Sequence, residues 1–231
     1  MREHSWQAIC FDLDGVLIHT MPDHAAAWLA ATRRYGLRVS REEIYAWEGE
    51  PGRLTATRLL RRGRGRSGSA RQLLREKERL FARRLRRRRI RVAEAWLTLL
   101  RRLRRGGLRL ALVTGTSWGE VRRALPARVR QAFDVIVTGD RVRRGKPDPE
   151  PYRAACRRLG LAPGRVVVVE NAPYGITSAR RAGVGWILAL ASALPPRHLR
   201  GADRIVRQAG RLRRVLGGLT SLKRPRTMGR A

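Results

Sequence analysis

The stretch QAICFDLD, residues 7–14, is a short apolar run that ends with two aspartates at alternate positions. Four further runs of this kind follow it, namely LRLALVTG (108–115), FDVIVTG (133–139), RVVVVEN (165–171) and GWILAL (185–190). Nearly continuous runs of Val, Ile and Leu that alternate with helical segments are typical of a parallel sheet covered on both faces. The sequence therefore predicts an α/β fold with a doubly wound, Rossmann-like parallel sheet.

About 90 residues separate the first run from the second, far more than a simple crossover between neighbouring strands needs. Helix signals fill this interval. Pro22 and Gly36 are placed to begin and end one helix, and Ser40 with Glu43 has the spacing of a capping box. Further on, SARQLLREKERLF (69–81) repeats apolar residues at helical spacing. We therefore expect the insertion to be a small α-helical domain.

We expect the chain to divide into an α/β catalytic core of residues 1–17 and 92–216, a helical cap of residues 18–91 and a loose basic tail of residues 217–231. The segment RRGRGRSGS (61–69) indicates a flexible basic interruption within the cap. An inserted domain that is joined to the core by two hinges, near the carboxyl end of a strand, is placed to act as a lid.

Arginine dominates the composition. The chain has 52 Lys+Arg against 18 Asp+Glu, a formal net charge of +34, and only Lys77, Lys146 and Lys223 are lysine. A GC-rich coding genome would produce such a bias, and the competing explanation is affinity for nucleic-acid phosphates through counterion release. The arginines are spread over nearly every polar segment and are not gathered with aromatic residues on one element. We therefore expect nucleic-acid binding to be only weak and non-specific.

The sequence also predicts where the protein is located and whether it associates with a membrane. No apolar run reaches the roughly 18 residues that a membrane span requires, and the first run begins too close to residue 1 to leave room for a signal peptide. Cys10 and Cys156 have neither metal-ligand nor redox spacing, and two reduced thiols fit a cytoplasmic protein. We expect a cytoplasmic monomer without a membrane partner.

Two carboxylates follow the first apolar run. Asp12 and Asp14 are two residues apart, so a regular strand would place both side chains on one face, and Gly15 allows a tight turn after them. Such a pair can divide two tasks between a nucleophile and an acid or base. Open α/β sheets bind ligands at the carboxyl ends of their strands, so the pair lies where a ligand site is expected.

The other runs add groups for an anion and a cation. Thr114 and the two backbone amides after it can hold an anion, and Lys146 is a compact ammonium in a chain that uses arginine nearly everywhere else. Glu170 and Asn171 offer hard oxygen ligands suited to magnesium. Taken singly, each of these residues is as readily a turn former, a cap or a solvated charge. Together, in this order at strand ends, they indicate one site.

With these residues the chain resembles a haloacid dehalogenase-like (HAD) hydrolase of the group that includes beta-phosphoglucomutase and small phosphatases. The resemblance extends from about residue 7 to residue 216, and its motifs are DLDGVL, the threonine of LVTGTS, the lysine of GKPDPEPY and the acidic pair position of VVVVENAPYGITSARRAG. It implies that Asp12 is a nucleophile that forms an aspartyl-phosphate and that Asp14 is a general acid and base. By the same resemblance, Thr114 and Lys146 steady the phosphoryl oxygens.

The resemblance further implies a Mg²⁺ cofactor. Its ligands would be Asp12, the backbone carbonyl of Asp14, Glu170 and Asn171. The chain departs from the family here, because Asn171 stands where the second acid is usual. Its amide oxygen remains a hard ligand of lower charge, which should weaken the cation site without abolishing it.

Residues from the cap and the core are expected to bind the substrate, a small phosphorylated metabolite. His24 matches a histidine that lies at the cap hinge in the mutase-like group. Arg53 and Lys77 belong to the cap segments WEGEPGR and REKERLF, and Gly115 and Thr116 follow the second apolar run.

Asp14 favours phosphate chemistry over dehalogenation, because cleavage of a phosphate ester must protonate a leaving oxygen. The sequence thus predicts a HAD-like phosphoric monoester hydrolase, a magnesium-dependent phosphatase of a small metabolite such as a sugar phosphate. A beta-phosphoglucomutase-like hexose-phosphate mutase is the alternative, because both reactions use the same aspartyl-phosphate and differ in whether the closed cap admits water or a sugar hydroxyl. A third hypothesis is a basic nucleic-acid-binding protein with a decayed catalytic core.

Overall fold

The computed structural model describes residues 6–63, 68–87 and 92–219. Their strands form one parallel sheet in the order β3-β2-β1-β4-β5-β6. The bounds are β1 Ala8–Phe11, β2 Arg109–Val113, β3 Val135–Val137, β4 Val166–Glu170, β5 Trp186–Leu190 and β6 Arg204–Val206. The order reverses between β1 and β4. This confirms the doubly wound, Rossmann-like fold and places the crevice for a ligand beside these two strands.

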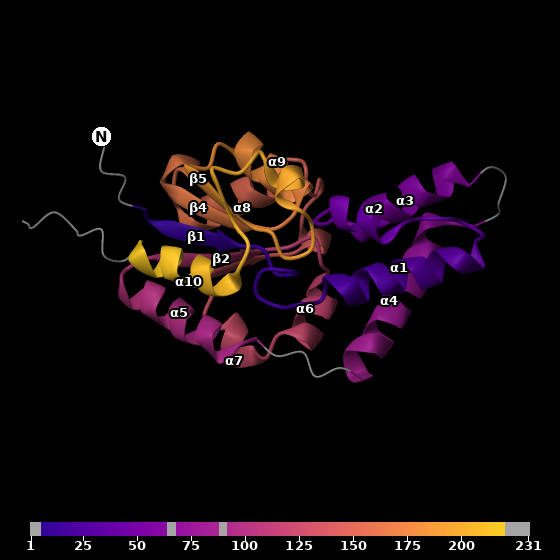
Figure 1. Ribbon diagram of the computed structural model, residues 1–231, viewed down its shortest axis with the longest axis horizontal. Coiled ribbons are helices and arrows are strands. Elements are labelled where there is room, and N and C mark those ends of the chain that lie inside the picture. The colour runs from indigo at the N-terminus through magenta and orange to yellow at the C-terminus, as the bar shows by residue number, and fades with distance from the viewer. Residues whose placement is uncertain (1–5, 64–67, 88–91, 220–231) are drawn as a thin grey trace, which may run out of the picture.

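Helices cover both faces of the sheet and extend to one side of it (Figure 1). The α-helices of the described residues are α1 Met21–Arg34, α2 Arg41–Ala46, α3 Gly52–Arg62, α4 Ala70–Arg87, α5 Glu94–Arg105, α6 Trp118–Ala124, α7 Ala127–Arg130, α8 Glu150–Leu159, α9 Pro173–Ala182 and α10 Ala209–Gly218. Figure 1 shows α5 and α10 on one face and α8 and α9 on the other, with α1 to α4 beside the sheet. None of the described helices combines the length and apolar character of a membrane span.

Alternate side chains of each strand enter two separate cores. In β1, Ile9 and Phe11 pack with the α5 and α10 side, whereas Ala8 and Cys10 pack with the α8 and α9 side. All four are fully buried. Because both faces of the sheet are apolar, polar side chains that serve a site are left to the ends of the strands.

The four helices α1 to α4, called the helical cap below, share an apolar core of their own. Trp28, Ile44, Leu59 and Leu73 are buried in it. The predicted capping box is present, since the Ser40 hydroxyl accepts from the amide of Glu43 and the Glu43 carboxylate accepts from the amide of Ser40. The expected insertion of a helical domain is confirmed. Residues 64–67 of the predicted basic interruption lie outside the described residues.

Three details differ from the predictions. Strand β1 ends at Phe11, so Asp12 and Asp14 lie in the loop after it and not on one face of a strand. Strand β6 was not predicted, because three residues at the edge of a sheet show no usable periodicity. Helix α10 continues through Gly218, two residues into the predicted tail, and residues 220–231 lie outside the described residues.

Candidate active site

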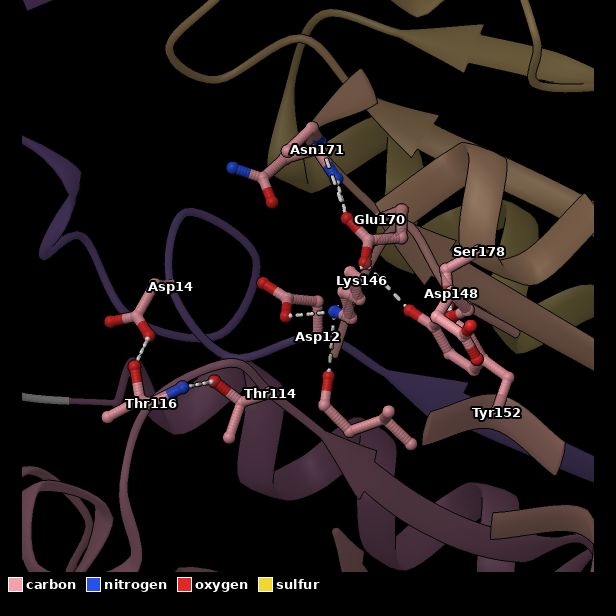
Figure 2. Close-up of polar contacts among 12 residues, drawn as sticks. Asp12, Asp14, Thr114, Thr116, Lys146, Asp148, Tyr152, Glu170, Asn171 and Ser178 are labelled. Carbon is pink, nitrogen blue, oxygen red and sulfur yellow. Dashed lines mark hydrogen bonds and ion pairs between the residues drawn. The ribbon is translucent and has the colours of Figure 1, made fainter. Parts of the chain in front are cut away.

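The ammonium of Lys146 lies at the centre of the polar groups at the carboxyl ends of β1, β2 and β4 (Figure 2). Its Nζ donates to Asp12 Oδ1 at 2.8 Å, to Glu170 Oε1 at 2.6 Å and to the backbone carbonyl of Val113 at 3.0 Å. Lys146 is only 1% exposed. The structure therefore brings three of the predicted site residues into direct contact.

Three separate acceptors explain why this position holds a lysine. An ammonium has three donors that can point in different directions, whereas the donors of a guanidinium lie in one rigid plane. Burial alone would lower the pKa of Lys146, but the carboxylates of Asp12 and Glu170 raise it above its ordinary value. The group therefore stays charged while buried.

Glu170 is saturated by protein donors. Its Oε1 accepts from Lys146 and from the hydroxyl of Tyr152 at 2.7 Å, and its Oε2 accepts from the backbone amides of Asn171 at 2.9 Å and Ala172 at 3.3 Å. Each carboxylate oxygen thus already has two donors. This geometry does not fit the prediction that Glu170 ligates the metal, and it fits a residue that positions Lys146. Tyr152, buried on α8, was missed by the sequence reasoning.

Asp14 lies in a second network, which connects the core to α1. Its Oδ1 accepts from Thr20 and lies 3.2 Å from His24 Nε2, and its Oδ2 accepts from Thr116 Oγ1 at 2.7 Å. Burial alone would raise the pKa of Asp14, but His24 and the two hydroxyls lower it to about 2. Asp14 is therefore an ionised carboxylate here. Thr20 was also missed by the sequence reasoning.

Asp12 has the opposite electrostatic environment. Burial raises the pKa of its carboxyl to about 8, and the neighbouring carboxylates of Glu170 and Asp14 add to the rise while Lys146 offsets part of it. Only Oδ1 of Asp12 is engaged by a donor from the described residues. The other oxygen is left for a ligand.

The fit of a metal ion can be judged from the free oxygens. No three His, Cys, Asp or Glu side chains of the described residues are grouped to hold a metal. However, Oδ1 and Nδ2 of Asn171 are buried without a hydrogen-bond partner in the described part of the chain, and Figure 2 shows the amide oxygen directed toward Asp12. Its Nδ2 would lie 2.2 Å from a Cβ at Gly15. The free carboxylate oxygen of Asp12 and the unpartnered amide oxygen of Asn171 therefore suit Mg²⁺, which needs few protein oxygens.

The comparisons with known proteins agree with this geometry. The sequence model for haloacid dehalogenase-like hydrolases matches residues 6–183. The chain belongs to this family. It is 34% identical to hexitol phosphatase A of Escherichia coli (strain K12) over 194 residues, 81% of this chain and 84% of the relative. It is 32% identical to validoxylamine A 7'-phosphate phosphatase of Streptomyces hygroscopicus subsp. limoneus over 180 residues, 78% and 83% of the two chains.

The fold of this HAD-like hydrolase is shared by solved structures. A candidate beta-phosphoglucomutase from Bacteroides vulgatus superimposes with a TM-score of 0.81 at 27% identity, and the match covers 96% of this chain and 91% of that one. With named phosphatases among its relatives, the HAD-like chain is a phosphoric monoester hydrolase.

A cavity lies between the helical cap and the core of the HAD-like enzyme. All five residues predicted to bind the substrate line it: His24, Arg53, Lys77, Gly115 and Thr116. Lys77 is buried and its Nζ lies 3.2 Å from Glu120 Oε1 on α6. Arg53 is exposed and donates to the carbonyl of Arg143. Predicted Thr114 is buried beside the cavity, and its hydroxyl accepts from the amide of Thr116 at 3.1 Å.

Bare backbone from the cap rests on the core next to Lys146. Gly49, with φ +86°, follows α2, and a Cβ there would lie 2.7 Å from Cδ of Lys146. A Cβ at Gly115 would lie 2.6 Å from the carbonyl oxygen of Gly49, and one at Gly139 would lie 2.1 Å from the carbonyl oxygen of Gly115. The cap loop can therefore approach the lysine only because these glycines carry no side chain.

Proposed function

We propose that this HAD-like hydrolase is a magnesium-dependent phosphatase of a small phosphorylated sugar or sugar alcohol and works through an aspartyl-phosphate on Asp12. The observation that carries the proposal is the separation of two networks, one that holds Asp12 on Lys146 and one that holds Asp14 on Thr20, His24 and Thr116. The name of hexitol phosphatase A supports a phosphorylated sugar alcohol or a close analogue as the substrate.

In the first step, a carboxylate oxygen of Asp12 attacks phosphorus, the bond from phosphorus to the ester oxygen breaks, and the leaving oxygen takes a proton from Asp14. Asp14 must first gain that proton. The approach of a phosphate, itself negative, raises the pKa of a neighbouring carboxyl group, and His24 lies in contact with Asp14 as a neighbour through which the proton can pass.

In the second step, water attacks phosphorus of the aspartyl-phosphate while Asp14 takes a proton from the water. The bond from phosphorus to the oxygen of Asp12 breaks, so that the free carboxylate returns and inorganic phosphate leaves. Asp14 is then protonated for the next ester. Its hydrogen bonds to Thr20 and Thr116 hold it in a network separate from the contact of Asp12 with Lys146.

Charge neutralisation is shared between Lys146 and the cation. Lys146 lies against Asp12 and stays protonated, so it can pair with the phosphoryl oxygens as they arrive. Mg²⁺ held by Asp12, the carbonyl of Asp14 and Asn171 would supply further positive charge to the transferred phosphoryl group. In this proposal Glu170 positions Lys146 and is not a Mg²⁺ ligand.

The test is release of inorganic phosphate from a panel of sugar and sugar-alcohol monophosphates, with Mg²⁺ and with EDTA. We expect Mg²⁺-dependent release, and loss of it in Asp12→Asn, because an amide cannot form the acyl phosphate. Glu94→Gln, an exposed position on α5, is the matched control and should keep full activity. If Asp12→Asn retained a tenth of the activity, the nucleophile assignment would be wrong. An isomeric sugar phosphate formed without phosphate release would favour the mutase reaction.

A further inference from the structure

The cavity between the helical cap and the core is acidic, although the protein carries a net charge of +34. Its lining includes five carboxylate side chains, namely Glu48, Glu50, Glu78, Glu120 and Asp140. The whole sequence has only 18 Asp and Glu residues, so this concentration sets the cavity apart from the rest of the molecule.

Three of these carboxylates are held by donors of the protein. Glu50 accepts from Thr55 and Arg58, Glu120 from Lys77 and Ser117, and Asp140 from Thr138 and the amide of Trp118. The side chains of Glu48 and Glu78 differ from them. Neither makes a hydrogen bond or ion pair with another residue in the described part of the chain, so both can accept from a bound molecule.

The cationic side chains that line the cavity are largely engaged. Lys77 is paired with Glu120, and its ammonium lies 4.9 Å from the ring centre of Phe81. His24 lies against Asp14. Arg53 is exposed at the rim and is held by the carbonyl of Arg143. A second anionic group on the substrate would therefore meet unpartnered carboxyl groups inside the cavity and one cation at its edge.

The electrostatics of the two free carboxyl groups point the same way. Burial raises the pKa of Glu48 well above its ordinary value, and the carboxylates of Asp14 and Asp12 raise it further. Burial, with the charge of Glu120, also raises the pKa of Glu78. Negative charge in the cavity is therefore already unfavourable. Hydroxyl or ammonium donors of a substrate would reduce the repulsion among the carboxyl groups, whereas a second phosphate or a carboxylate would increase it.

We propose that Glu48 and Glu78 select the leaving group of the ester: it presents hydrogen-bond donors, either hydroxyls or an ammonium, and it carries no second anionic group. This inference rests on the proposed phosphatase function and specifies the class of its substrate. Discrimination of this kind works by an unfavourable contact with the wrong substrate as well as a favourable one with the right substrate.

The test compares kcat/KM for glucose 6-phosphate, glucosamine 6-phosphate and glucose 1,6-bisphosphate, with p-nitrophenyl phosphate as an ester that has no hydroxyl, ammonium or second phosphate group. We expect the bisphosphate to be at least tenfold poorer than glucose 6-phosphate, and the amino sugar to be at least as good as it. Glu78→Lys should raise the ratio of bisphosphate to monophosphate at least tenfold. Glu48→Gln should lower the ratio of amino sugar to neutral sugar severalfold.

Ratios of two substrates cancel a general loss of folded or active enzyme. Glu76→Gln is the matched control, because Glu76 lies on the same helix as Glu78 and pairs with Arg34 and Arg79 outside the cavity. Its ratios should equal those of the wild type. Equal rates for the bisphosphate and the monophosphate, or unchanged ratios in both Glu48 and Glu78 variants, would overturn this inference alone. Failure to hydrolyse every ester, p-nitrophenyl phosphate included, would overturn the phosphatase proposal and this inference with it.

Discussion

Asp12 and Asp14 are separated by one residue, and the structure gives their carboxyl groups opposite acidities. The pKa of Asp12 is raised to about 8 and that of Asp14 is lowered to about 2. The proposed reaction needs an ionised Asp12 and a protonated Asp14. A cation at Asp12 and a phosphate near Asp14 would shift both pKa values in the required direction. We therefore expect bound ligands to favour the protonation states that the proposed reaction needs.

The raised pKa of Asp12 has a consequence for stability. The folded state binds the proton more tightly than the unfolded state, whose value is 3.8, so stability is lost as pH rises from about 4 through about 8. In EDTA, Asp12→Asn should therefore raise Tm, with a small effect at pH 4–5 and a larger one at pH 8 and above. A gain of about 1 kcal/mol corresponds to roughly 2–4 °C for a chain of this size. A Tm at pH 8 below that of the wild type in calorimetry would contradict the assignment.

Asn171 provides a test of the cation site. An aspartate there would add a full negative charge beside Asp12, so Asn171→Asp should lower the Mg²⁺ concentration for half-maximal activity severalfold and increase the Tm shift caused by Mg²⁺. Glu170→Gln should instead reduce turnover more than Mg²⁺ affinity, because Glu170 holds Lys146. An unchanged or higher Mg²⁺ requirement in Asn171→Asp would remove Asn171 from the ligand set.

Among the elements, the loop between α2 and α3 lies directly against the side chain of Lys146. Gly49→Ala places a Cβ against the lysine side chain at a left-handed φ, so kcat/KM should fall at least tenfold. Gly107→Ala is the matched control, because Gly107 has φ +85° and nothing within 4 Å of its Cβ position. Both variants should lose about 1–2 kcal/mol of stability through the backbone. Equal kinetic losses in the two variants would show that contact with Lys146 is unimportant.

The secondary-structure elements could be predicted from the sequence more completely than the contacts within the site. The apolar runs of β1 to β5 and the capping box at Ser40 are local signals, and both were confirmed. The hydrogen-bond partners of the site side chains could not be predicted from such local signals. Glu170 was expected to bind metal, yet the donors that saturate it include Tyr152 and Lys146, whose positions depend on how α8 packs against β2 and β3 and on the loop before it.

Across the molecule, many of the arginines that produce the net charge also stabilise the fold. They occupy the last turns of α1, α3, α4, α5 and α9, where cations stabilise the helix dipole. Arg58 and Arg62 also lie over the ring of Trp47. These roles account for many of the charges without a polyanionic partner.

We therefore expect duplex DNA to bind weakly and without sequence preference. In fluorescence anisotropy at a series of salt concentrations, the logarithm of the binding constant should fall steeply and linearly with the logarithm of the salt concentration. Such a slope is expected because counterion release drives the binding. Asp12→Asn should give the same curve. Submicromolar binding at physiological salt would revive the hypothesis of a nucleic-acid-binding protein.

The contact of Gly49 with Gly115 joins cap to core by backbone alone, and within the core Gly139 lies directly against Gly115. Between Gly49 and Gly115 the two partners need only the absence of side chains, whereas Pro51 of the same loop packs against Gly145. A foreign cap loop should therefore be tolerated if it keeps a glycine in this place, while the catalytic groups beneath stay as they are. Exchange of this one loop, in evolution or by engineering, could then change the substrate range while the catalytic chemistry stays the same.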